Sequence, residues 1–240
     1  MLTYCCVNEQ GDRPCQEDTV GVCVLDNKAL FVVADGLGGH GKGDKASAAI
    51  VHYALERFGE ESQPKEFYED IITNGNERLL SIQKELGMPE SVKTTLVCSM
   101  ISDNTITGVH IGDSRLYLFY NGEIIYRSVD HSVPQMLALS GEISESQIRK
   151  HPDRNKVLHV LGNSEKKPVY QSHGPWDLKN GISVLLCTDG FWEYVEENKM
   201  ERFLRQSKSV NEWMMKMKKM IIRKGIFRNQ DNFSAIGIWI

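Results

Sequence analysis

The sequence predicts an α+β protein in which antiparallel β-sheets are covered by helices. Short β-prone runs follow one another across turns, and Asn121-Gly122, a strong signal for a two-residue hairpin, separates the runs 115–120 and 123–127. Sequential strands joined by short turns pair in antiparallel fashion. Helical patterns are grouped between blocks of strands and do not alternate with them, so we expect helices to cover the faces of the sheets.

The individual elements follow from the period of the apolar residues. Asp26 and Asn27 are turn residues between two apolar runs and predict a first hairpin. Strands are predicted over 20–25, 30–34, 95–101, 105–111, 115–120, 123–127, 182–187 and 233–240. Helices are predicted over 45–58, 66–86 and most of 200–223. The polar stretch 131–161 is expected to hold small helices in an excursion from the core.

Composition excludes several classes of protein. Hydrophobic residues make up 41% and charged residues 25%, which is ordinary for a globular chain of 240 residues. The net charge of −4, without a long basic stripe, gives no reason to expect a nucleic-acid partner. No apolar run approaches the roughly 20 residues of a membrane span, so we expect no membrane partner. The six cysteines form no CxxC pair and no signal peptide precedes them, so we expect reduced thiols in a cytoplasmic monomer.

One stretch near the end of the chain mixes basic and apolar residues. Lysine and arginine at 216, 218, 219, 223 and 224 are interleaved with methionine and isoleucine at 214, 215, 217, 220, 221 and 222. This spacing favours a helix with one buried apolar face and one solvated basic face. The alternative is a contact surface for an acidic partner.

Several apolar runs end at an aspartate beside a glycine. The runs 30–34 and 184–188 lead into Asp35-Gly36 and Asp189-Gly190, and the run 109–111 leads more loosely into Gly112-Asp113. One such pair is usually a simple turn. Three in one domain suggest that buried strands fix several carboxylates in place, with glycines that permit sharp turns or the close approach of a ligand.

Clustered carboxylates resist burial unless a cation neutralises them. Aspartates without nearby Cys or His ligands favour hard cations, meaning Mg²⁺ or Mn²⁺. Arg13 lies close to Glu17 and Asp18 in the sequence, and arginine matches the oxygens of phosphate with two parallel hydrogen bonds. Asp231 adds an acid at the start of the last predicted strand. The residues alone therefore indicate a site for hard cations, and such a site, with an arginine beside it, is suited to the hydrolysis of phosphate esters.

In their order, these segments resemble the metal-dependent PPM (type 2C) Ser/Thr protein phosphatases, especially the compact bacterial form. The resemblance covers nearly the whole chain. Its motifs are the segment 13–18, the loop 35–40 with Gly43, Ala46 and Ser47, Thr94-Thr95-Leu96, Gly112-Asp113-Ser114-Arg115, Asp130-His131-Ser132, His151-Pro152 with Arg154-Asn155, Thr188-Asp189-Gly190 and Asp231-Asn232.

The resemblance implies a fold and a role for each matched residue. The fold would be a four-layer αββα sandwich formed by one domain over 1–240, with a flap at about 131–165. Two Mn²⁺ or Mg²⁺ ions would lie at one edge between the sheets, and a water bridging them would attack the phosphate directly. Asp35 would bridge the ions, the Gly36 carbonyl would serve one of them, and Asp189 and Asp231 would hold the first. Glu17 and Asp18 would act through metal-bound waters, Asp113 could hold a third ion with Asp189, and Arg13 would bind the substrate phosphate.

Three positions depart from the family pattern. Leu37 stands where many eukaryotic relatives have a histidine proposed as general acid, which leaves the proton donor open between His40 and a metal-bound water. Gln16 replaces an asparagine and Lys93 a glycine, for which we expect small local adjustments. His131, His151 and Trp192 are expected to have structural roles.

The resemblance implies an active phosphatase for phosphoserine and phosphothreonine in proteins, with a cognate Ser/Thr kinase and its targets as candidate partners. Three alternatives stay open from the sequence. The chain could be a catalytically weak regulatory relative that binds phosphoproteins, a phosphatase of small phosphate esters, or a plain cation-binding module. The sequence leaves open the physiological substrate, the metal used in the cell, the occupancy of a third site and the regulation.

Overall fold

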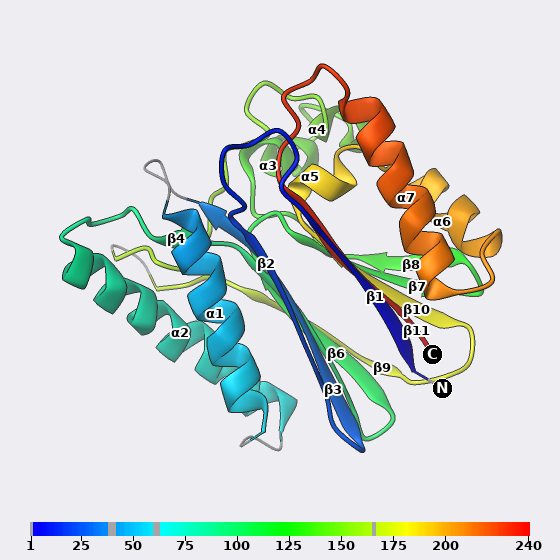
Figure 1. The fold of residues 1–240 in the computed structure, drawn as a ribbon, viewed down its shortest axis with the longest axis horizontal. Coiled ribbons are helices and arrows are strands. Elements are labelled where there is room, and N and C mark those ends of the chain that lie inside the picture. Colours follow the sequence, from blue (N-terminus) through cyan, green and yellow to red (C-terminus); the bar gives the residue numbers. More distant parts are fainter. Residues whose placement is uncertain (1, 38–41, 60–62, 165–166) are drawn as a thin grey trace.

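The computed structural model describes residues 2–37, 42–59, 63–164 and 167–240 (Figure 1). Its strands are β1 Thr3–Glu9, β2 Asp18–Val24, β3 Lys28–Leu37, β4 Lys93–Thr94, β5 Leu96–Ser102, β6 Thr105–Ile111, β7 Arg115–Tyr120, β8 Glu123–Arg127, β9 Gln171–Asp177, β10 Ile182–Cys187 and β11 Phe233–Trp239. Its helices are α1 Gly43–Phe58, α2 Pro64–Leu86, α3 Val133–Leu139, α4 Glu145–Ile148, α5 Asp189–Trp192, α6 Glu197–Arg205 and α7 Val210–Gly225.

Within these ranges, two antiparallel sheets pack face to face between two layers of helices. One sheet has the strand order β1-β11-β10-β7-β8, and the other has the order β2-β3-β5-β6-β9, with the short β4 beside β3. Helices α1 and α2 cover the second sheet, and α6 and α7 cover the first (Figure 1). The predicted αββα sandwich is therefore confirmed.

Apolar side chains fill each space between the layers. Phe31, Val33, Leu116, Leu186 and Ile236 belong to the cluster between the two sheets, and all are fully buried. Because successive side chains of a strand point to opposite faces, the alternate residues of the same strands pack under the helices. These two-sided strands explain why the sequence shows continuous apolar runs such as 30–34.

The predicted amphipathic stretch 214–224 is confirmed and lies within α7, but the helix predicted over most of 200–223 forms two helices, α6 and α7. The break falls before Ser209, whose side chain accepts a hydrogen bond of 3.2 Å from the backbone N–H of Glu212 and caps α7. Trp213 and Met217 are buried against the sheet, whereas Lys219 is exposed. The basic face of α7 is thus solvated, as the spacing predicts.

Strands β1 and β9 were not predicted. The β9 sequence QSHGPWD is polar and contains Pro175, features that a strand tolerates at the edge of a sheet, where β9 lies. Strand β1 is also an edge strand and has mostly exposed or half-buried side chains. None of the helices in the described ranges is long and apolar enough to cross a bilayer.

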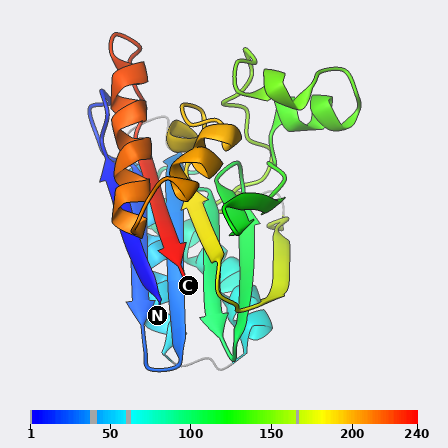
Figure 2. The same cartoon turned by 90° about the vertical axis from the view of Figure 1, so that its right-hand side faces the viewer.

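The excursion contains the small helices α3 and α4, as predicted. Figure 2 shows this light-green segment standing off beyond one end of the sheets. Isolated bridges pair Ser132 with Val157 and Thr94 with Leu161, so the excursion leaves and rejoins the sandwich at defined points. The chain then returns to the edge of the second sheet as β9.

A buried ion pair ties the start of β7 to the segment after β8. The Nε and Nη2 atoms of Arg115 each donate to one carboxylate oxygen of Asp130 at 2.7 Å, and both side chains are 1% exposed. The guanidinium lies over the Trp192 ring, with 3.5 Å between its central carbon and the ring centroid. Such a pair is costly to break, since removal of one partner leaves a buried charge.

Replacement of Arg115 by methionine should therefore lower the free energy of unfolding by about 3–5 kcal/mol. Urea denaturation with an unchanged m-value would measure it. Arg127→Met is the matched control, because its partner Glu145 is exposed and such pairs contribute about 1 kcal/mol or less. Equal losses in the two variants would contradict the stabilising role of the buried pair.

Candidate metal centre

The predicted site residues meet at one end of the sandwich. Asp18 at the start of β2 lies opposite Asp35 near the end of β3 in the antiparallel register. Asp113 follows β6, Asp189 begins α5 directly after β10, and Asp231 precedes β11. Because neighbouring strands run in opposite directions, strand ends and strand starts alternate at this edge, and residues far apart in sequence come together.

Hydrogen bonds join the two sheets at this edge. The Thr188 hydroxyl donates to a carboxylate oxygen of Asp18 at 3.0 Å, which links the end of β10 to the start of β2. The Asn232 side chain accepts from the backbone N–H of Glu17 at 2.8 Å and donates to the carbonyl of Cys15 at 3.0 Å. The segment that contains Arg13, Glu17 and Asp18 is therefore held against the segment that contains Asp231.

Strand β3 is longer than the predicted strand 30–34, since it continues through Leu37 and pairs with β4, with Gly36 opposite Thr94. Gly36 therefore does not form a turn but permits a close approach of the backbone, because a Cβ atom there would lie 2.1 Å from the carbonyl oxygen of Gly43 and 2.6 Å from that of Glu17. Gly112 does serve a turn, since its φ of 106° favours glycine.

Two threonines that the sequence left without a role fix the backbone of Asp35. The N–H of Thr95 and the hydroxyl of Thr94 both donate to the Asp35 carbonyl, at 2.9 and 2.8 Å. The N–H of Asp35 donates in turn to the Thr95 hydroxyl at 3.1 Å. Their hydrogen-bonding side chains at a strand start are the only sequence signal for this function.

The carboxylates are buried close to one another, and their pKa values show it. Burial, and then the charges of Asp18, Asp189, Asp113 and Asp231, hold the pKa of Asp35 well above its usual range. Burial raises the pKa of Asp18 to about 8, although hydroxyl donors oppose this shift. Burial and the charge of Asp231 raise the pKa of Asp189 to about 6, against a hydrogen bond from the N–H of Gly190. A nearby positive charge would therefore stabilise the ionised form of each of these aspartates.

Arg13 supplies one such charge at the outer side of the cluster. Its Nη2 donates to a carboxylate oxygen of Asp231 at 2.7 Å, and the two side chains are 43% and 40% exposed. The hydrogen bond that Arg13 donates to Asp231 is the main cause that raises the pKa of Arg13, and the charges of Asp231, Asp189 and Glu17 add to it. Glu17 accepts from the N–H of Gly43 at 3.2 Å.

The donor set fits a hard divalent cation by its chemistry. The residues that converge offer oxygen atoms, and the mutual repulsion of their buried carboxylates would be relieved by a bound cation. Within the described ranges, no three His, Cys, Asp or Glu side chains are arranged to enclose an ion as they stand. Closure around a cation would thus require side-chain rearrangement.

Asp113 is connected to the buried ion pair of β7. Its backbone carbonyl accepts a hydrogen bond of 2.9 Å from the indole N–H of Trp192, on whose ring Arg115 lies. Trp192 is a core residue, as predicted. Burial and the charge of Asp189 raise the pKa of the Asp113 carboxyl, which places it beside the other acids.

The positions of the remaining predicted residues agree with structural roles. His131 accepts from the N–H of Gly112 at 3.3 Å, and burial lowers its pKa to about 4, so it stays neutral near pH 7. His151 accepts from the N–H of Asp153 at 3.1 Å. Gln16 bonds both to Asn8 and to the N–H of Asp18, so the amide is used locally. His40, the candidate proton donor, lies outside the described residues.

The raised carboxyl pKa values predict an unusual pH dependence of stability without metal. An acid whose pKa is raised by folding binds more protons in the folded state, so stability falls as pH rises toward that pKa. The pKa of Asp18 is raised to about 8 and that of Glu193 to about 7. In a chelator, the free energy of unfolding should fall between about pH 5 and 8 and level off above pH 8, by about 1.4 kcal/mol or less per proton and pH unit.

Denaturant titrations across this range would measure the slope. Asp18→Asn should flatten it, and Mn²⁺ or Mg²⁺ should stabilise the protein more at the upper pH than at the lower one. A stability that stays constant or rises with pH in the chelator would contradict the electrostatic account of the cluster.

Comparison with known proteins gives the family. Residues 8–220 match the family model described as Protein phosphatase 2C. The chain is 30% identical over 228 residues to the serine/threonine phosphatase stp of Listeria welshimeri, covering 92% of this chain and 88% of that protein.

Solved structures agree with this match. The Staphylococcus aureus serine/threonine phosphatase Stp1 superposes with a TM-score of 0.88 at 25% identity, covering 100% of this chain and 95% of that one. The catalytic domain of the phosphatase PstP in complex with two manganese ions gives 0.82 at 25% identity, covering 99% and 97%. With its αββα sandwich and its matched acidic motifs, the chain belongs to the protein phosphatase 2C family.

Proposed function

We propose that this chain is a metal-dependent protein serine/threonine phosphatase. The observation that carries the proposal is the convergence of the buried Asp18 and Asp113 and the half-buried Asp35 and Asp189 beside Asp231 and Arg13 at one edge of the two sheets. Its relatives are named serine/threonine phosphatases, and one related structure holds two manganese ions. A regulatory relative without activity would have no need for this complete acidic set.

The residues have distinct proposed roles. Asp35, the Gly36 carbonyl, Asp189 and Asp231 would hold two ions of Mn²⁺ or Mg²⁺. Asp35 is suited to a fixed central position because three hydrogen bonds from Thr94 and Thr95 hold its backbone. Glu17 and Asp18 would act mainly through metal-bound waters. Asp113, with Asp189, would complete a third site.

When bound, the divalent ions would acidify a water for direct attack on phosphorus and neutralise charge on the phosphoryl oxygens. Arg13 would orient the phosphate through its two donor nitrogens and stabilise the charge of the transition state. The direct reaction requires no covalent phosphoenzyme. The buried Cys98 and Cys187, whose thiol pKa values are strongly raised by burial, are accordingly unsuited to serve as nucleophiles.

We further propose that 1–240 act as one phosphatase domain in which 131–165 form a flap beside the metal centre. The bridges at Ser132–Val157 and Thr94–Leu161 give this segment fixed bases. We propose that the chain acts as a monomer in the cytoplasm, and its six free cysteines support this location. The proposed substrates are phosphorylated proteins, including targets of a cognate kinase.

Hydrolysis of a phosphothreonine peptide should require added Mn²⁺ or Mg²⁺ and should fall by about 10²-fold or more in Asp35→Ala and in Asp189→Ala. Arg13→Ala should raise the KM for phosphopeptide and lower kcat, because it removes contacts to the phosphate both in the bound substrate and in the transition state. Initial rates of phosphate release would measure these effects.

Cys15→Ser is the control within the same segment, and its activity should stay within about twofold of the unchanged protein because no cysteine acts as a nucleophile. Full activity in both aspartate variants, or activity in excess chelator, would refute the proposal. A higher kcat/KM for small phosphate esters than for phosphopeptides would instead favour a small-ester phosphatase.

A further inference from the structure

A basic cleft of about 800 Å³ lies beside the metal centre. The segment after α4, the end of α5 and the end of α7 form its walls. Its charged lining consists of Arg149, Lys150, Arg154, Arg223, Lys224 and Arg228, with Glu193 and Glu196. The protein as a whole is acidic, with a net charge of −4, so this concentration of positive charge is a local property.

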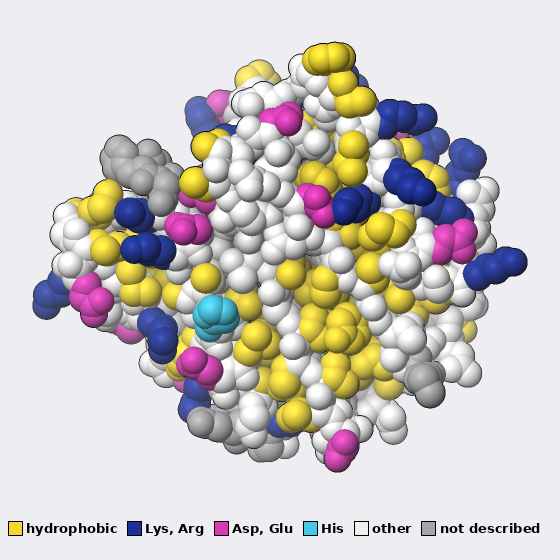
Figure 3. Space-filling model, in the orientation of Figure 1, with side chains coloured by type: hydrophobic (Ala, Val, Ile, Leu, Met, Phe, Trp, Pro, Cys, Tyr) yellow, Lys and Arg dark blue, Asp and Glu magenta, His cyan; other side chains and the backbone are white. Residues whose placement is uncertain are grey.

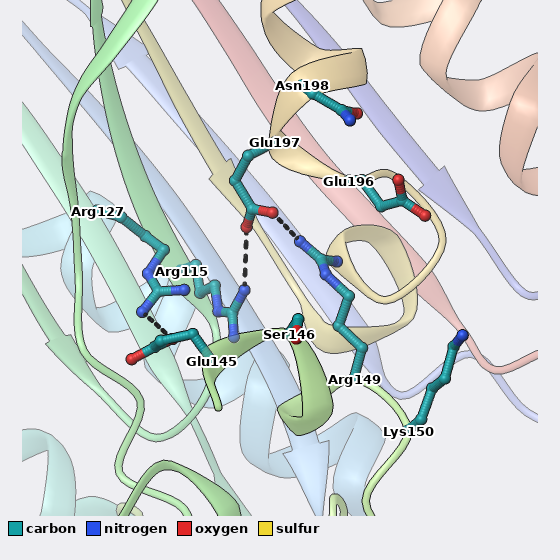
Figure 4. A pocket seen from close by; sticks show the side chains of 9 residues that line it. All are labelled: Arg115, Arg127, Glu145, Ser146, Arg149, Lys150, Glu196, Glu197 and Asn198. Carbon is teal, nitrogen blue, oxygen red and sulfur yellow. Dashed lines mark hydrogen bonds and ion pairs between the residues drawn. The ribbon is translucent and has the colours of Figure 1, made fainter. Parts of the chain in front are cut away.

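The cations of the cleft fall into two groups. Arg149 is held by Glu197 at 2.5 Å, and Arg154 by Glu193 at 3.0 Å. Figure 4 shows the first pair and shows Lys150 extending away from it. In the described part of the chain, Lys150, Arg223 and Arg228 make no ion pair, and all three are exposed. These three cations are free to receive an anionic ligand.

The cleft is continuous with the acidic centre. Glu193, which pairs with Arg154 in the cleft wall, lies one helical turn after Asp189 and donates its N–H to the Asp189 carbonyl at 2.9 Å. On the opposite wall, the loop that carries Arg228 leads within three residues to Asp231. Residues that flank a phosphate bound at Arg13 are therefore within reach of this cleft.

The rim adds exposed apolar surface beside the basic groups. Ile226 lines the cleft and is exposed, and Phe227 next to it is fully exposed with a φ of 65°, a conformation that is rare for an aromatic residue. A hydrogen bond of 2.9 Å from the N–H of Arg228 to the Gly225 carbonyl closes the turn. Figure 3 shows hydrophobic side chains at the top of the molecule, where this loop lies in Figure 1.

We propose that this cleft binds anionic side chains that flank the phosphorylated residue of a protein substrate, so that the enzyme prefers phosphosites in acidic or multiply phosphorylated segments. The inference rests on the proposed phosphatase function and specifies its substrate class. Lys150, Arg223 and Arg228 would contact the anionic groups, and Ile226 and Phe227 would contact an adjacent apolar residue. Charge complementarity of this kind acts mainly on association and specificity.

The test compares three phosphothreonine peptides that differ only in their flanks, which carry glutamates, glutamines, or a second phosphate as phosphoserine. The protein with Mn²⁺ should show a kcat/KM about tenfold higher for an anionic flank than for the glutamine flank, and this preference should weaken from about 0.05 to 0.5 M salt. Arg223→Glu/Arg228→Glu should remove the preference through KM, while p-nitrophenyl phosphate hydrolysis stays within about twofold.

The matched control is Lys84→Glu/Lys219→Glu, which changes the net charge equally at exposed positions outside the cleft. It should keep the preference to within about twofold. The milder Arg223→Gln/Arg228→Gln gives the same comparison without new negative charges. A higher rate for glutamate flanks identifies carboxylates as the ligand, and one restricted to the phosphoserine peptide identifies phosphate.

Equal kcat/KM for all three peptides, or equal effects of the cleft and control variants, would overturn the inference. Binding of a fluorescein-labelled glutamate peptide without phosphate, measured by anisotropy in chelator, separates this result from failure of the proposed function. If the protein hydrolyses no phosphate ester but binds this peptide through Arg223 and Arg228, the proposed phosphatase activity is refuted and the proposed binding of anionic groups in the cleft is supported. If it hydrolyses phosphopeptides without any preference, only the proposed role of the cleft is refuted.

Discussion

Electrostatic repulsion among buried carboxylates is the constraint on which the catalytic edge of this protein depends. Isolated aspartates can leave the interior, but here each is fixed by the end or start of a strand whose other residues are buried in the core. The protein offsets part of the repulsion with aimed donors, such as the Thr188 hydroxyl on Asp18 and the Gly190 N–H on Asp189. These donors are not sufficient, because the carboxyl pKa values stay raised. A bound cation would offset the repulsion that remains.

The surrounding structure resists this repulsion because both sheets are braced on either side of the site. Thr188 and Asn232 connect the sheets directly, and Arg115 joins β7, Asp130 and Trp192 beneath Asp113. Glu197 links the same arginine to Arg149 in the wall of the basic cleft (Figure 4). The same side chains therefore support the proposed metal centre and the proposed substrate cleft. We expect a substitution of Arg115 or Glu197 to alter the geometry of both.

Much of this arrangement could be predicted from the sequence because it depends on local patterns. Apolar runs located most central strands, and the order of the motifs predicted that Asp35, Asp113, Asp189 and Asp231 would meet. The paired role of Arg115 and Asp130 could not be predicted, because nothing local to either residue identifies its partner. Strands β1 and β9 were missed because edge strands need no apolar face, and the need for Gly36 depends on the approach of Gly43, which only the fold brings about.

Strand order also affects how this site is assembled. Strand β11 lies between β1 and β10, so Asn8 pairs with Ser234 across almost the full length of the chain. Contacts between residues so distant in sequence form slowly, since closure of a long loop costs conformational entropy before any contact repays it. Asp231 reaches the other acids only when β11 has inserted. If the proposed metal centre includes Asp231, affinity for divalent ions is a late product of folding, and its return during refolding would report the insertion of a single central strand.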